Sequence, residues 1–115
     1  MVEKLRLILT DGIYYFRTFE FGRDIPFKIY DETDTAFNYT GYTVVIRFLD
    51  DSLVQELNDI IPLTTTPSSG TGTFEFSSTN RPEIAGYHFF EANLTKSGEE
   101  LVALSPRSLV SDSPD

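Results

Sequence analysis

The sequence predicts an all-β protein, a two-sheet antiparallel β-sandwich of seven or eight short strands. Segments rich in β-branched and aromatic residues recur roughly every 8 to 12 residues, with turn-forming residues between them, and no segment has a firm helical period. The chain contains 10 Phe and 6 Tyr but no Trp, which favours strands. At 115 residues it has the length of one domain, and without cysteine it depends on its core for stability.

The clearest predicted strand is the segment 41–49, which follows a turn and alternates in character. One face is wholly apolar, while the other mixes apolar and polar side chains, and this pattern is typical of a strand inside a sheet. The same alternation in two other segments predicts a common core. Its expected members are Ile25, Phe27, Ile29, Tyr42, Val44, Ile46, Phe48, Phe74 and Phe76.

The remaining strands are less sharply defined. They are expected at 5–9, 13–21, 25–30, 73–76, 86–94 and 100–104. The dipeptide Asp11-Gly12 is a tight-turn signal and predicts a hairpin between the first two strands. Pro26 has no backbone N–H, so its strand is expected to begin at an edge or unpaired. The segment 53–61 fits helical spacing as well as a strand, and we favour a strand or an irregular edge.

Two segments are predicted to lack regular structure. Residues 62–72 are rich in Thr, Ser, Pro and Gly, the composition of a flexible loop. The residues after Ser105 are rich in Pro, Ser and Asp and hold few apolar side chains. We therefore expect a domain over residues 1–106 and a flexible C-terminal tail over residues 107–115.

The charge of the chain excludes several classes of partner. Its formal net charge is −9, from 18 acidic and 9 basic residues, which argues against binding to nucleic acid or to anionic membranes. No apolar run reaches membrane-spanning length. The N-terminal residues lack the apolar core of a signal peptide, so we expect synthesis in the cytoplasm without ordinary secretion.

No catalytic or metal-binding pattern stands out, and we predict no enzymatic activity and no cofactor. His88 is the only histidine, whereas a metal site or a catalytic triad usually needs further partners, so it is interpreted as structural or as a surface residue. The acidic segments 31–34 and 50–51 could gather oxygen ligands for Ca²⁺. Their spacing is not that of an EF-hand, and solvated turn carboxylates are the simpler interpretation. A carboxylate pair for glycoside hydrolysis is not marked by any burial signal.

The aromatic segment 13–21 is the best candidate for an interaction surface. It carries more large apolar side chains than one small core face needs, although core and hairpin packing is the alternative. The candidate docking residues are Tyr14, Tyr15, Phe16, Phe19 and Phe21. Unpaired sheet edges are a second candidate surface. Tyr87 follows a glycine at the start of a late strand and is predicted to form a tyrosine corner, with its hydroxyl bonded to nearby backbone.

Several segments together resemble a known family, the immunoglobulin-like N-terminal domains of upper baseplate proteins from phages of Gram-positive bacteria. The similarity spans residues 5 to 106. The residues that carry it are Asp24 to Asp31 (DIPFKIYD), Gly41 to Phe48 (GYTVVIRF), Gly72 to Phe76 (GTFEF), Ala85 to Glu91 (AGYHFFE) and Leu104 to Pro106 (LSP). Members of the family usually continue into a long C-terminal region, whereas the present sequence stops at Asp115.

The resemblance implies an immunoglobulin-like fold and an assembly role in a virion. Such a module would hold other virion proteins in a tail baseplate and would have no enzymatic activity. We also expect several copies of this protein to associate within the particle. Alternatives are a small capsid decoration or head-fibre adapter protein, a carbohydrate-binding β-sandwich and a small hydrolase. Binding to a glycan array would favour the carbohydrate-binding β-sandwich. Turnover that is lost on single Asp or Glu changes would favour the small hydrolase.

Overall fold

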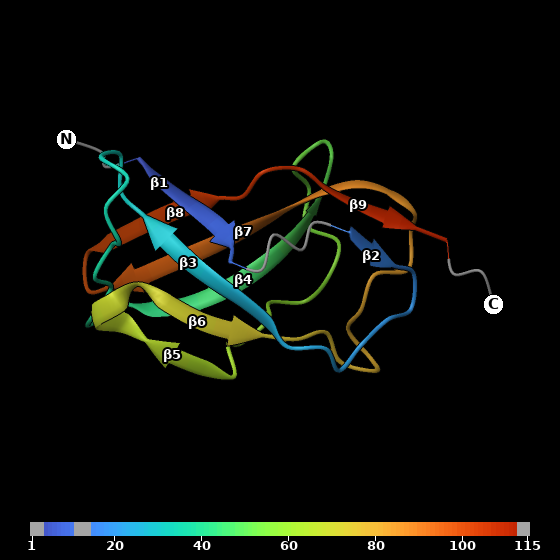
Figure 1. Ribbon diagram of the computed structural model, residues 1–115, viewed down its shortest axis with the longest axis horizontal. Helices are drawn as coiled ribbons and strands as arrows, with labels where there is room; N and C mark the ends of the chain where they lie inside the picture. The colour runs from blue at the N-terminus through green and yellow to red at the C-terminus, as the bar shows by residue number, and fades with distance from the viewer. Residues whose placement is uncertain (1–3, 11–14, 113–115) are drawn as a thin grey trace.

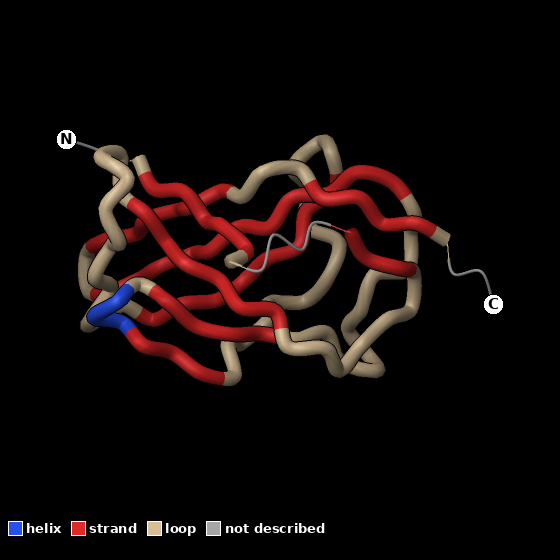
Figure 2. Tube along the Cα trace, viewed as in Figure 1, coloured by secondary structure: helices blue, strands red, loops and turns tan. Residues whose placement is uncertain are grey.

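The computed structural model describes residues 4–10 and 15–112, and these residues form an all-β structure (Figure 2). Within them lie nine strands and one short 3₁₀ turn, η1 (Pro67–Ser69). The strands are β1 (Leu5–Leu9), β2 (Tyr15–Arg17), β3 (Ile25–Tyr30), β4 (Thr43–Asp50), β5 (Thr64–Thr66), β6 (Thr71–Phe74), β7 (Gly86–Lys96), β8 (Glu99–Leu104) and β9 (Ser108–Ser111). The predicted fold class is confirmed at this level.

The strands pair in one mixed sheet, where the sequence predicts two antiparallel sheets. The order is β2-β9-β7-β8-β1-β3-β6-β5, and β4 pairs with the other side of β7. Two pairs are parallel, β1 with β8 and β2 with β9. Strand β1 makes the sheet continuous because it pairs with β8 at its start and with β3 over the rest of its length.

The sheet folds over on itself and encloses an aromatic core. In Figure 1, β3 and β6 cross in front of β4 and β7. Phe74 of β6 lies against Phe90 of β7, with ring centroids 5.4 Å apart, although these strands are not neighbours in the sheet. Of the nine predicted core residues, eight are buried, and the ninth, Tyr42, is partly buried and packs against the core.

The predicted hairpin between the first two strands does not form. Strand β2 pairs with β9, and β1 pairs with β3 and β8. The pairing with β9 places Phe16 in the core, against Phe76 and Phe90 at centroid distances of 5.8 and 5.4 Å. Burial of this ring against distant aromatics therefore outweighs the local turn signal at Asp11-Gly12, which lies outside the described residues.

The C-terminal region differs from the predicted tail. Ser108–Ser111 form β9, which lies between β2 and β7. Ser108 and Val110 are both buried. The burial alternates over these four residues, but the sequence does not show it, because one buried residue, Ser108, is polar and the apolar Leu109 is only partly buried. Residues 113–115 lie outside the described part of the chain.

In the middle of the chain, the structure agrees in part with the sequence predictions. Residues 53–61 run as an irregular edge beside β4, where Ile46 and Ile60 exchange two backbone hydrogen bonds of 2.8 Å. The predicted loop 62–72 contains β5 and η1, because Thr64–Thr66 pair with β6. Strand β3 is an interior strand, and Pro26 lies just beyond the end of the β1 ladder.

Candidate docking site at the β2–β9 end

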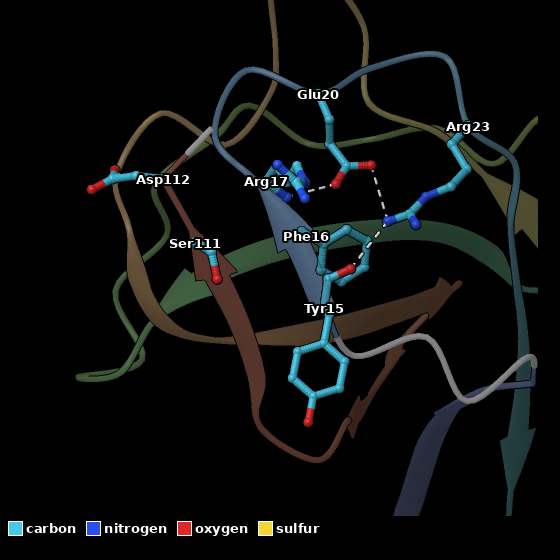
Figure 3. Close-up of a pocket in the computed structure, with 7 residues that line it drawn as sticks. All are labelled: Tyr15, Phe16, Arg17, Glu20, Arg23, Ser111 and Asp112. Carbon is cyan, nitrogen blue, oxygen red and sulfur yellow. Dashed lines mark hydrogen bonds and ion pairs between the residues drawn. The ribbon is translucent and has the colours of Figure 1, made fainter. Parts of the chain in front are cut away.

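A cavity of about 580 Å³ opens where the first aromatic segment meets the last strand. Its walls bring together residues that lie at opposite ends of the sequence (Figure 3). They are Tyr15, Phe16, Arg17, Glu20, Arg23, Ser111 and Asp112. The pairing of β2 with β9 creates this site, because it places the segment 15–23 beside residues 111–112.

Two side chains cover the outer edge of β2, which is the terminal strand at this end of the sheet. Glu20 accepts a hydrogen bond from the backbone N–H of Arg17 at 2.7 Å. Arg23 donates to the carbonyl of Tyr15 at 3.3 Å and pairs with Glu20 at 2.9 Å. A further strand would offer a carbonyl and an N–H at these two positions. We call Glu20 and Arg23 the edge clasp, since they occupy the bonding positions of an added strand.

The predicted docking residues divide into exposed and buried groups. Tyr15 is 72% exposed, Phe19 50% and Phe21 53%. Phe16 is only 2% exposed, so its ring belongs to the core and reaches the site only as part of the cavity wall. The alternation along β2 explains this, because Phe16 lies opposite the buried Val110. Tyr14 lies outside the described residues.

Arg81 joins the two exposed phenylalanines. Its guanidinium lies 5.3 Å from the ring centroid of Phe19 and 5.4 Å from that of Phe21, and it donates to the Phe19 carbonyl at 3.3 Å. Phe19 itself has a φ of +67°, and its N–H donates to Pro82 at 2.6 Å. A bulky residue rarely adopts this left-handed conformation, so the backbone here is strained in order to hold an aromatic ring at the surface.

A second cavity, of about 230 Å³, lies on the other side of Tyr15. It is lined by Tyr15, Tyr87, Arg107 and Leu109. The Arg107 guanidinium lies 3.9 Å from the ring centroid of Tyr87. The exposed aromatics of this end are therefore accompanied by arginines, and we call Tyr15, Phe19, Phe21 and Tyr87 with Arg23, Arg81 and Arg107 the aromatic–arginine surface.

Tyr87 does not form the predicted corner. It is 45% exposed, and within residues 4–10 and 15–112 its hydroxyl finds no hydrogen-bond partner. The alternation of β7 turns Tyr87 outward and the next residue inward. Tyr39 makes the expected kind of bond instead, because its ring is buried and its hydroxyl donates to the carbonyl of Thr71 at 2.5 Å. Burial also raises the pKa of the Tyr39 hydroxyl.

His88 is a packed interior residue. Its ring stacks on Phe48 with centroids 4.5 Å apart and an angle of 10° between the planes. The nitrogen Nε2 lies 3.0 Å from a carboxylate oxygen of Glu56, and Nδ1 lies 3.0 Å from the Gly86 carbonyl. The His88–Glu56 contact ties the irregular segment 53–61 to β7, as the structural interpretation of the histidine requires.

The acidic turns use their carboxylates to bind their own backbone. Asp31 accepts hydrogen bonds from the hydroxyl and N–H of Thr33 and from the N–H of Thr35, and these bonds lower its pKa. Asp50 accepts in the same way from Ser52 and Val54. Across the described part of the chain, no group of three or more His, Cys, Asp or Glu residues is arranged to hold a metal ion.

Comparison with protein-family models and with curated proteins finds no match for this chain. None of the helical residues that the structure describes belongs to a helix capable of spanning a bilayer. The aromatic residues of this surface could be predicted from the sequence, but its arginines could not. Arg23 lies close in sequence to the aromatic residues of 15–21, and this proximity is a local signal. Arg81 and Arg107 lie far away in sequence and are brought to the surface by the tertiary structure.

Proposed function

We propose that this protein is a non-enzymatic structural protein of a virion, which docks other virion proteins through the aromatic–arginine surface. The observation that carries this proposal is the exposure of Tyr15 at the wall of an open cavity, together with the exposure of Phe19 and Phe21 on the segment that follows β2. Isolated exposed apolar residues are ordinary, but a group of aromatic rings beside a concavity is typical of a binding surface.

The composition of the surface fits a protein partner. Tyr, Phe and Arg are enriched at protein interfaces, and Tyr and Arg recur among the residues whose truncation costs most binding energy. The chain as a whole carries a net charge of −9, yet this end presents Arg17, Arg23, Arg81 and Arg107 beside the carboxylates of Glu20 and Asp112. An acidic partner can therefore approach here with less repulsion than elsewhere.

The finer fold assignment belongs to the same proposal. We infer an immunoglobulin-like β-sandwich, in which β4, β7 and β8 form one layer and β3, β6 and β5 form the other. Aromatic contacts between the layers, such as Phe74 with Phe90, support this arrangement. The strand β1 then joins the layers along one side through its pairs with β8 and β3.

The place in the virion rests on the family resemblance alone. A tail baseplate is the favoured position, and a capsid decoration or head-fibre adapter is the alternative within the same class. Carbohydrate binding is a second candidate function, because Tyr15 forms a wall of two cavities and an exposed aromatic ring can stack on a sugar.

Co-sedimentation with virus particles that lack the protein tests the proposal. We expect saturable binding, lost in the double variant Phe19→Ser, Phe21→Ser and retained in Val102→Ser, which alters an exposed apolar residue of β8. Protein that stays in the supernatant with every such particle would contradict virion assembly. Saturable binding to a glycan array in its place, abolished by Tyr15→Ala, would establish the carbohydrate-binding alternative.

A further inference from the structure

Strands β2 and β5, at the two ends of the main strand order, differ in how their free edges are covered. At one end, the edge clasp covers β2 with Glu20 and Arg23. At the other end, β5 pairs only with β6 among the described strands, and Thr64–Thr66 are all exposed. In Figure 1, β5 lies along the lower margin of the fold. A terminal strand leaves half of its N–H and C=O groups directed away from the sheet, ready to pair with another strand.

The β5 strand and its neighbours in sequence carry no charge in an otherwise highly charged chain, although Asp59 and Glu75 line a cavity with Ile61 and Leu63. Residues 60–74 contain no Asp, Glu, Lys or Arg, although the chain has 18 acidic and 9 basic residues in all. Charged side chains on an edge strand, lysine above all, are a common protection against pairing with another chain. The β5 edge lacks this protection, and its three threonines favour strand structure.

We propose that β5 is a self-association surface, on which two copies of this chain pair their β5 strands antiparallel about a two-fold axis. Such an interface is self-complementary, because each copy contributes the same strand. Two copies that each carry −9 repel one another, and pairing through β5 brings no charged side chain of the strand itself into contact. Ile61 and Leu63, which are 67% and 55% exposed, add apolar area beside the paired strands.

The prolines that flank β5 set the length of the contact. Pro62 and Pro67 have no N–H to donate, so continuous pairing is restricted to residues 63–66. The interface is accordingly short and weak between two isolated copies, and repeated attachment to one particle would strengthen it through high local concentration. The β5 surface is separate from the aromatic–arginine surface, so dimerisation and docking can be lost independently.

Sedimentation equilibrium at up to about 1 mM protein tests the proposal, since a dimer with millimolar Kd is populated at that concentration. We expect reversible association of the 13.0 kDa chain that strengthens with salt, because salt screens the repulsion between copies. Thr65→Lys places like charges across the axis and should weaken the dimer about tenfold or more, whereas Thr65→Val keeps a strand-forming residue and should retain it.

Thr79→Lys is the matched control, because it makes the same change in net charge at an exposed turn and should leave the dimer intact. Phe21→Ser should also leave it intact if β5 rather than the aromatic–arginine surface is the interface. Unchanged thermal unfolding of Thr65→Lys shows that the monomer still folds. A wild-type protein that stays monomeric at about 1 mM, or a dimer that Thr65→Lys does not weaken, would overturn the proposal.

Discussion

Glu20 and Arg23 form an ion pair of 2.9 Å along the outer edge of β2, and each also bonds the backbone of that strand. The pair is partly exposed, so its direct contribution to the free energy of unfolding is small, about 0 to 1 kcal/mol. Its larger effect is to block strand pairing, because it occupies the backbone groups of Tyr15 and Arg17 that another strand would bond.

Removal of the edge clasp should therefore promote aggregation more than unfolding. For the double variant Glu20→Ala, Arg23→Ala we expect a melting temperature within a few degrees of wild type but faster aggregation by light scattering. Lys96→Ala is the control, since it removes another ion pair between residues three apart. Equal aggregation rates for the two variants would show that the clasp does not protect the edge.

The burial of one face of β4 gives a prediction about stability. Ile46 is completely buried, so Ile46→Asp places an unpaired charge in the core and should leave the domain largely unfolded. Thr43→Asp, on the same strand but exposed, should unfold near the wild-type temperature. Circular dichroism melting curves distinguish the two, and wild-type stability of Ile46→Asp would show that the strand register is wrong.

Tyr39 and Tyr87 should respond differently to loss of the hydroxyl. Tyr39→Phe removes the bond to Thr71 and leaves that carbonyl without this donor, so we expect a loss of about 1 kcal/mol in urea unfolding. Tyr87→Phe should have no measurable effect, because that ring is exposed. A larger effect at Tyr87 than at Tyr39 would contradict the assignment.

Tyr39 also makes stability depend on alkaline pH. Burial raises its pKa above the ordinary value of 10.0, so the folded state holds this proton more tightly than the unfolded state does. The resulting stabilisation is complete below pH 10.0 and is lost as pH rises through the pKa of the folded state. Urea unfolding across this range should show the loss in wild type and not in Tyr39→Phe.

Asp31 gives the opposite sign at acidic pH. Hydrogen bonds from Thr33 and Thr35 lower its pKa below the ordinary value of 3.8, so the folded state favours the charged carboxylate. Wild type should be more stable than Asp31→Asn above pH 3.8, and this advantage should disappear as pH falls through the lowered pKa. If wild type stays more stable than Asp31→Asn in strong acid, the charge of the Asp31 carboxylate is not the source of the difference.

Local pattern was enough to predict most of the strands and the core. The alternation in 25–30 and 41–49 identified residues that are buried in the structure, because a period of two fixes which side chains share a face. It could not predict partners. The turn signal at Asp11-Gly12 indicated a hairpin, whereas β2 pairs with β9 at the far end of the chain, a contact that depends on the fit of Phe16 into the core.

The same limit explains what was missed at the candidate site. Exposed aromatics in 15–21 could be anticipated from their excess over one core face, but Phe16 could be assigned to the core only once its partner Val110 was known. The polar composition after Ser105 concealed β9, since four residues with two buried positions are too few to alter the average composition. Arg81 and Arg107 lie far from this segment in sequence and reach the surface only through the fold.

Site-specific photo-cross-linking in assembled particles tests the docking surface most directly. A benzophenone side chain at position 21 samples the aromatic–arginine surface, and the same group at position 102 samples an exposed apolar position on β8. We predict that position 21 cross-links to a different virion protein in high yield and that position 102 does not. Cross-linking from position 102 with none from position 21 would show that the aromatic–arginine surface is not where this protein docks.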